Sequence, residues 1–166
     1  MKIKFFIIFM LLTFSCENRQ YNSSDSIDRF NSTNEEEMSM MKQKLAIALN
    51  KGDFKLYNEA SNFFLLRGLF PELYFYAFLM ANKYNCPEAY YHLYLILTIK
   101  IKYNSIVFPA NDKSIRSYAY YYLLKSYELG FDTTKIIVKD IFGDNIPESE
   151  SFMKITNQLY GGSVPH

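Results

Sequence analysis

Cysteine and histidine are scarce in this chain, which limits both metal binding and cross-linking. The 166 residues include two cysteines and two histidines, and one histidine is the final residue, His166. A metal site built on these residue types needs several ligands that converge on one point. Cys86 and His92 stand on either side of a predicted helix start and do not face each other. The sequence therefore predicts no metal centre. Cys86 is interpreted as a small residue at a turn and His92 as a flanking residue beside Leu93.

Glycine and basic charge are also limited. The six glycines are scattered, whereas a phosphate-binding loop needs clustered glycines, and no serine-centred nucleophile elbow occurs. Lys and Arg number 18 against 17 Asp and Glu, for a net charge of +1. No basic excess is left to neutralise a nucleic-acid backbone. We therefore expect no enzymatic activity, no cofactor and no nucleic-acid partner.

A hydrophobic run long enough to cross a membrane is missing from the N-terminus. The apolar stretch Phe5–Leu12 is far shorter than the roughly 20 residues that a transmembrane helix needs. It follows the positive residues Lys2 and Lys4, and its length is typical of a secretion signal. Residues 1–15 are therefore predicted to form a signal peptide that is removed on export.

The segment that follows resembles the lipobox of bacterial lipoproteins. Small Ser15 before Cys16 fits that pattern, although Phe14 is bulky and Leu12 lies one place further from the cysteine than in the common form. The resemblance implies that Cys16 carries a lipid and attaches the protein to a membrane, where two or more acyl chains anchor stably. Glu17 in place of Asp favours the outer membrane of the cell envelope. The alternative is an ordinary cleaved signal peptide with an incidental cysteine.

The rest of the chain divides by composition. Residues 16–34 are rich in Asn, Ser and Asp without periodicity, which predicts a flexible lipid-anchored tether. Residues 35–158 form the predicted folded body, and residues 159–166 a flexible C-terminal tail. With Cys16 acylated, Cys86 would have no partner for a disulfide.

The predicted folded body contains the helix-starting and helix-ending residues that are typical of an all-α fold. Hydrophobic residues make up 49% and aromatic residues 18% of the chain, enough for a packed core. Capping residues such as Asp53 and Asp112, with glycines after the helix ends and prolines at the starts, delimit seven helices. The predicted helices are 35–50, 53–67, 71–84, 87–101, 112–129, 132–142 and 147–158. We expect Asn34 to cap the first helix and Glu35–Glu37 to interact with its dipole.

A weak repeat suggests how these helices are arranged. Three triplets have the same spacing across three predicted turns: Ala48, Gly52 and Leu56; Ala81, Asn85 and Ala89; Ser126, Gly130 and Thr134. A small residue lets two helices pack closely, and Gly or Asn supplies a left-handed turn. Residues 81–89 and 119–130 resemble Sel-like repeats, a subfamily of tetratricopeptide repeats. The resemblance implies a short α-solenoid of stacked antiparallel hairpins with six or seven helices, and protein binding. An unrelated helical bundle is the alternative.

Tyrosine is abundant, with 15 copies. Helical spacing places one set of residues in the core: Ala119, Tyr122, Leu123, Ser126 and Leu129. A second set forms a candidate protein-binding surface: Tyr90, Tyr91, Tyr94, Tyr118, Tyr120 and Tyr121. Tyrosine is enriched in binding hot spots, although these rings could instead pad the space between helices.

Together these patterns favour a non-catalytic adaptor that binds another protein at the membrane. One version is an immunity-type lipoprotein that neutralises a toxin, and another is an assembly component of the envelope. An enzyme or small-ligand binder would instead need a deep pocket with convergent polar groups.

Overall fold

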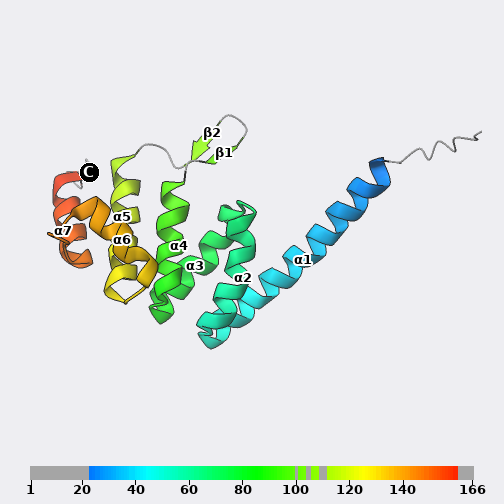
Figure 1. Ribbon diagram of the computed structural model, residues 1–166, viewed down its shortest axis with the longest axis horizontal. Coiled ribbons are helices and arrows are strands. Elements are labelled where there is room, and N and C mark those ends of the chain that lie inside the picture. Colours follow the sequence, from blue (N-terminus) through cyan, green and yellow to red (C-terminus); the bar gives the residue numbers. More distant parts are fainter. Residues whose placement is uncertain (1–22, 100, 104–105, 109–111, 161–166) are drawn as a thin grey trace, which may run out of the picture. The chain divides into compact units, whose positions relative to one another are not determined.

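The computed structural model describes residues 23–99, 101–103, 106–108 and 112–160 (Figure 1). Within those ranges the elements are α1 (Ser23–Lys51), α2 (Phe54–Leu66), α3 (Phe70–Tyr84), α4 (Pro87–Thr98), β1 (Ile101–Tyr103), β2 (Ile106–Phe108), α5 (Lys113–Glu128), α6 (Asp132–Phe142) and α7 (Ser149–Tyr160). The chain divides into two compact units between Glu36 and Glu37. The second unit contains α1 from Glu37 onwards and all later elements. No helix in the described ranges has the length and hydropathy needed to cross a membrane.

Within the second unit, the helices from α2 to α6 pack in chain order as antiparallel neighbours, and α7 packs on α5 (Figure 1). The main packed pairs are α2/α3, α3/α4, α4/α5, α5/α6 and α5/α7. Contacts also link alternate helices: the Tyr84 hydroxyl of α3 donates to the Leu49 carbonyl of α1 at 2.7 Å, and Tyr57 of α2 hydrogen-bonds to His92 of α4. The predicted all-α fold, a short α-solenoid of stacked helical hairpins, is confirmed.

Local sequence signals account for most helix boundaries. The Asp53 side chain accepts a hydrogen bond from the Leu56 backbone at 2.9 Å, and Asp112 accepts one from Ser114 at 2.6 Å. These bonds satisfy backbone donors that a helix start leaves unpaired. Prolines lie in the first turns of α3 and α4, where a missing N–H group has no cost. The predicted caps of α2 and α5 are therefore confirmed.

The turns inside the hairpins adopt the predicted left-handed conformation. Backbone φ is 68° at Gly52, 53° at Asn85 and 84° at Gly130. The small residues before two of these turns, Ala81 and Ser126, are completely buried. Close approach of the paired helices therefore depends on these small side chains, as the repeat pattern predicted.

The first helix differs from the prediction. It begins at Ser23 and not at residue 35, because neither glycine nor proline interrupts the sequence up to Lys51. Asn34 is therefore not a cap, and Glu35–Glu37 do not lie in the first turn, so both of those predictions are wrong. The Arg67 guanidinium instead pairs with the Glu37 carboxylate at 2.9 Å. The predicted tether at 16–34 stays a prediction, and residues 1–15 with Cys16 lie outside the described residues.

A short antiparallel β-hairpin separates α4 from α5. α4 ends at Thr98, so its predicted extension to residue 101 is wrong. Ile101 pairs with Phe108 and Tyr103 with Ile106. Both three-residue strands are rich in β-branched and aromatic residues, which favour strands over helix.

The core consists of two clusters of buried side chains. The larger one joins α1 to α4 around Tyr57, Phe64 and Leu93 and extends to Tyr122 of α5. The smaller one lies between α5 and its later neighbours and has Leu123, Leu124 and Val138 at its centre. Four of the five residues predicted to be core in α5 are buried. The prediction for Leu129 is wrong. This residue is 42% exposed, because it caps the end of α5.

Replacing Gly52 by alanine tests the tight turn between α1 and α2. An added Cβ would lie 2.9 Å from two ring atoms of Tyr84, which is held by its hydrogen bond to Leu49. Gly130 also has positive φ, but an added Cβ there meets nothing within 4 Å. In urea unfolding we expect Gly52→Ala to cost about 2–3 kcal/mol and the control Gly130→Ala about 1 kcal/mol. Equal losses would mean that the Tyr84 ring moves aside freely.

Candidate binding groove

An apolar groove lies where α5, α6 and α7 meet. Its volume is about 550 Å³. The first half of α5, the last turn of α6 and the middle of α7 supply most of its lining. The lining residues are Lys113, Arg116, Ser117, Tyr120, Ile141, Phe142, Pro147, Phe152, Ile155 and Thr156. This volume falls within the range of known ligand sites.

Three aromatic rings form the base of the groove. The Tyr120 ring lies edge-on to Phe142 at 5.8 Å and to Phe152 at 6.3 Å between centroids, and Phe142 meets Phe152 at 5.8 Å. Edge-to-face geometry at these separations is favourable. One ring from each of three helices therefore fixes the base of the groove.

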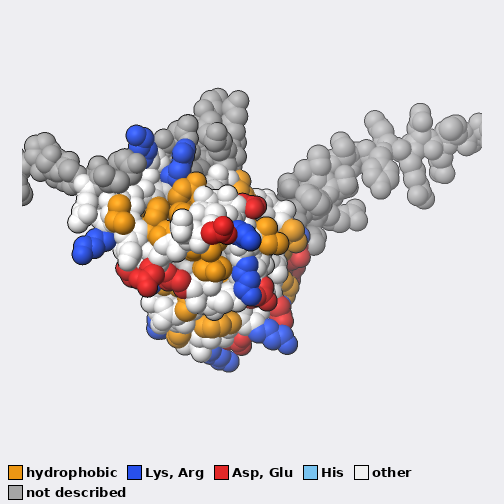
Figure 2. Space-filling view, turned by 60° about the vertical axis from the view of Figure 1, so that its left-hand side comes forward, with side chains coloured by type: hydrophobic (Ala, Val, Ile, Leu, Met, Phe, Trp, Pro, Cys, Tyr) orange, Lys and Arg blue, Asp and Glu red, His pale blue; other side chains and the backbone are white. Residues whose placement is uncertain are grey.

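The rim of the groove is apolar on two sides and basic at one end. Ile141 of α6 is 38% exposed and Ile155 of α7 is 56% exposed. Lys113 and Arg116 come from the first two turns of α5, and none of the described residues that line the groove is acidic. On the face of the molecule in Figure 2, hydrophobic side chains form several separate patches with charged side chains between them.

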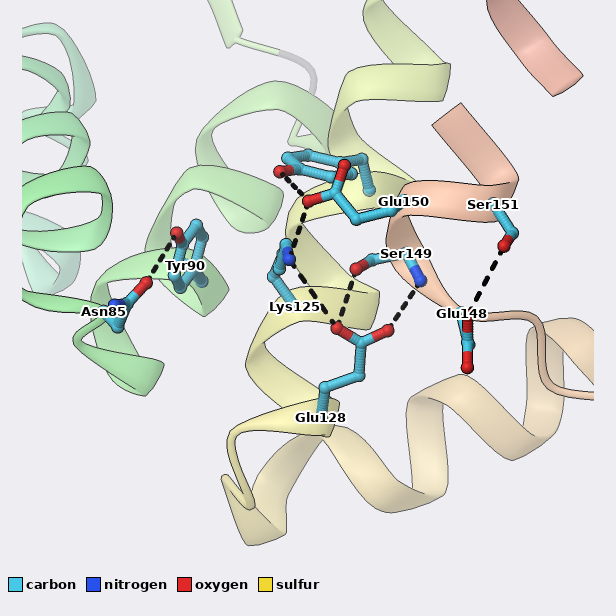
Figure 3. A network of polar contacts seen from close by, with 9 residues as sticks. Asn85, Tyr90, Lys125, Glu128, Glu148, Ser149, Glu150 and Ser151 are labelled. Carbon is cyan, nitrogen blue, oxygen red and sulfur yellow. Dashed lines mark hydrogen bonds and ion pairs between the residues drawn. The ribbon is translucent and has the colours of Figure 1, made fainter. Parts of the chain in front are cut away.

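A polar network attaches the start of α7 to α5 (Figure 3). The Glu128 carboxylate accepts hydrogen bonds from the Ser149 backbone at 2.6 Å and from its hydroxyl at 2.7 Å. Lys125 pairs with Glu150 at 2.8 Å, and the Tyr121 hydroxyl donates to Glu150 at 3.2 Å. The hydrogen bond between Lys125 and Glu150 raises the pKa of the amine and lowers that of the carboxyl. Burial, followed by the charge of Glu150, raises the pKa of Tyr121 to about 12.

The six tyrosines of the predicted protein-binding surface have different environments. Tyr118 is 49% exposed, Tyr90 is 4% exposed, and the other four are half-buried: Tyr91, Tyr94, Tyr120 and Tyr121. Tyr91 stacks on Tyr94 with 6.2 Å between ring centroids. Tyr120 is the one member of the set that lines the groove. A binding role for these residues stays a prediction.

Sequence reasoning missed most of the groove. Phe142, Phe152 and Ile155 were not singled out, although Phe152, Ile155 and Thr156 recur at i, i+3 and i+4 along α7. That spacing marks one face of a helix. The sequence does not specify that this face lies beside α5 and the end of α6.

A second polar cluster lies between α2 and α4. The Tyr57 hydroxyl and His92 Nδ1 are 2.9 Å apart, and the Cys86 thiol lies 3.9 Å from the Glu88 carboxylate. Burial raises the pKa of Cys86 to about 11, so at neutral pH the thiol is protonated and a weak nucleophile. Cys86 is buried at the turn as predicted, and no group of three His, Cys, Asp or Glu among the described residues is placed to hold a metal ion.

His92 differs from its predicted flanking position. It is 4% exposed, because α2 covers the face of α4 that carries it. Burial lowers its pKa to about 4. The neutral imidazole is therefore the form that the folded protein stabilises.

Protonation of His92 should destabilise the protein in mild acid. An unfolded chain binds this proton near pH 6.5 and the folded chain near pH 4, so the unfolded state holds more protons in between. The contribution of neutral His92 to the free energy of unfolding is complete above about pH 6.5. It falls by about 3 kcal/mol as the pH drops to about 4. His92→Gln keeps a hydrogen-bonding side chain without a titrating group. Urea unfolding at several pH values should show a free energy of unfolding that depends less on pH in this variant than in the wild type. Identical pH dependence would mean that groups other than His92 cause the acid sensitivity.

Comparisons with known proteins give no relative for this chain. No protein-family model, no curated protein and no solved structure matches it.

Proposed function

We propose that this chain is a lipid-anchored, non-catalytic module that binds another protein at the cell envelope. The observation that carries the protein-binding part is the apolar groove between α5, α6 and α7. Its base is a cluster of three aromatic rings, and its rims present further exposed isoleucines. Exposed apolar surface bordered by polar residues is typical of interaction sites.

The character of the groove favours a protein over a small molecule. Ile141 and Ile155 line the groove, yet they are 38% and 56% exposed. A small ligand inside the groove would leave part of these two side chains in water. A protein segment would cover both, and burying large apolar side chains contributes about 1.5–3 kcal/mol each.

The membrane part of the proposal rests on the N-terminal sequence. Positive residues, an apolar stretch of eight and Ser15–Cys16 follow one another in the order of a lipoprotein signal. A lipid on Cys16 would place the folded body beside the outer membrane. The partner would then be a protein of the envelope or one that enters it.

Two kinds of partner fit this proposal. An immunity-type protein would bind a toxin, and its deletion would leave cells sensitive to that toxin. An assembly protein would bind a resident envelope component, and its deletion would leave toxin resistance unchanged. The Sel-like resemblance of residues 81–89 and 119–130 supports protein binding in both cases.

Labelling with radioactive palmitate tests the anchor. The full-length protein should incorporate label and sediment with membranes, because the Cys16 thiol is the proposed site of acylation. Cys16→Ser should lose both properties, whereas Cys86→Ser, at a buried thiol, should keep them. Equal labelling of wild type and Cys16→Ser would contradict the proposed anchor.

Affinity capture from detergent-solubilised envelopes tests protein binding. We expect wild type to retain a partner in stoichiometric amount and Ile155→Ser to lose most of it. Ile136→Ser changes an isoleucine that is 73% exposed and outside the groove, so it should behave as wild type. If Tyr118→Ala loses the partner and Ile155→Ser keeps it, the partner binds at the exposed Tyr118 and not at the groove. Capture of no stoichiometric partner would contradict the proposed function.

A further inference from the structure

We propose that α7 is a detachable helix: it separates from α5 and α6 as a unit, while the helices from α2 to α6 stay folded, and it opens the groove as it leaves. This inference concerns a motion of the fold and stands whether or not a partner binds the groove. Three observations support it: the small apolar area that α7 buries, the position of its polar attachments, and the open space beside its middle.

α7 buries little apolar surface. Among its described side chains only Ser149 and Thr156 are buried, and both are polar. Phe152 is half-buried against the second core cluster, whereas α6 places Val138, which is completely buried, at the centre of that cluster. Among the described residues the extensive helix contact of α7 is with α5 alone. Because apolar burial is what mainly holds a helix to its neighbours, α7 is held more weakly than α6.

The polar attachments of α7 to α5 lie in its first turn (Figure 3). The Glu128 carboxylate accepts two hydrogen bonds from Ser149, and Lys125 pairs with Glu150 at 2.8 Å. The Glu150 side chain is 70% exposed, and an ion pair in water contributes little to stability. α5 therefore holds α7 at one end, chiefly through Glu128.

The groove leaves open space beside the middle of α7. Phe152, Ile155 and Thr156 all line it. The Phe152 ring makes aromatic contacts with Tyr120 and Phe142, but Ile155 is 56% exposed. The Thr156 hydroxyl donates to the Phe152 carbonyl at 2.6 Å, so this bond stays inside α7. Side chains that face open space lack the contacts that would oppose separation of the helices.

The connection between α6 and α7 provides a pivot. Residues 143–148 form neither helix nor strand, and Asp144 and Asn145 are exposed. Ile146 is half-buried and packs against the second core cluster, so it anchors the connection to the part that stays folded. The pivot therefore lies between Ile146 and Ser149, where a few loop residues can absorb the change in backbone angles.

Hydrogen exchange of the full chain, followed by mass spectrometry of peptic peptides, tests this proposal. At neutral pH we expect the amides of α7 to exchange at least about 100-fold faster than those at the centre of α5, and at similar rates along α7. Urea below the unfolding transition should accelerate exchange in α7 only weakly, because detachment of one helix exposes less surface than unfolding of the whole chain.

Matched variants test the attachment. Glu128→Ala removes the acceptor of both Ser149 hydrogen bonds, so it should speed exchange in α7 by about tenfold or more and leave α2 to α4 unchanged. Phe152→Ala removes the ring that packs on α5 and α6, and should act in the same direction. The control Glu59→Ala removes an exposed carboxylate from α2 and should change exchange in α7 by less than about twofold.

Four outcomes would overturn the proposal. Equal exchange rates in α6 and α7 would mean that the two helices open together. Rates that rise steadily along α7 toward Tyr160 would describe fraying of a helix end and not detachment of a unit. Faster exchange throughout the chain in Glu128→Ala, or loss of its fold, would show that α7 belongs to one cooperative unit with the rest. Unchanged exchange in both Glu128→Ala and Phe152→Ala would show that these contacts do not hold α7 in place.

Discussion

Packing around α5 is the constraint on which the C-terminal half of the structure depends. α5 contacts α4, α6 and α7, so it must bury side chains on more than one face. Its small residues make this possible: Ala119 and Ser126 are completely buried, and the Ser126 hydroxyl donates to the Pro87 carbonyl of α4 at 2.8 Å. A larger side chain at either position would separate the helices, and an apolar one at Ser126 would also remove the hydrogen bond to the Pro87 carbonyl. The face of α5 that remains after these contacts lines one side of the groove.

Local features of the fold could be predicted because short stretches of sequence determine them. Asp53 and Asp112 cap their helices through hydrogen bonds to residues two or three positions away. The left-handed backbone conformation at Asn85 is likewise a local property, because asparagine tolerates positive φ. Features that need two distant segments were missed. The groove requires α7 to return to α5, and the burial of His92 requires α2 to cover α4. Neither arrangement leaves a signal in the sequence of a single helix.

The tyrosines illustrate the same limit. Tyr90 and Tyr118 both belong to tyrosine-rich helices, yet the first is buried against Tyr122 and the second is exposed. Tyrosine suits both environments because its ring is apolar and its hydroxyl polar. Periodicity within one helix separates an inner from an outer face. It does not identify which outer residues a neighbouring hairpin covers, so the candidate surface contained residues of both kinds.

The β1–β2 hairpin bears on how this architecture can vary. It lies between two stacked helical hairpins, whereas the turns inside those hairpins are short and held by left-handed residues. β1 and β2 pair with each other, so this insertion supplies its own hydrogen-bond partners. Adding residues to a connecting segment costs little free energy as its length grows. The junction between α4 and α5 is therefore the place in this fold to fuse a reporter or an epitope, since α4 and α5 pack directly against each other.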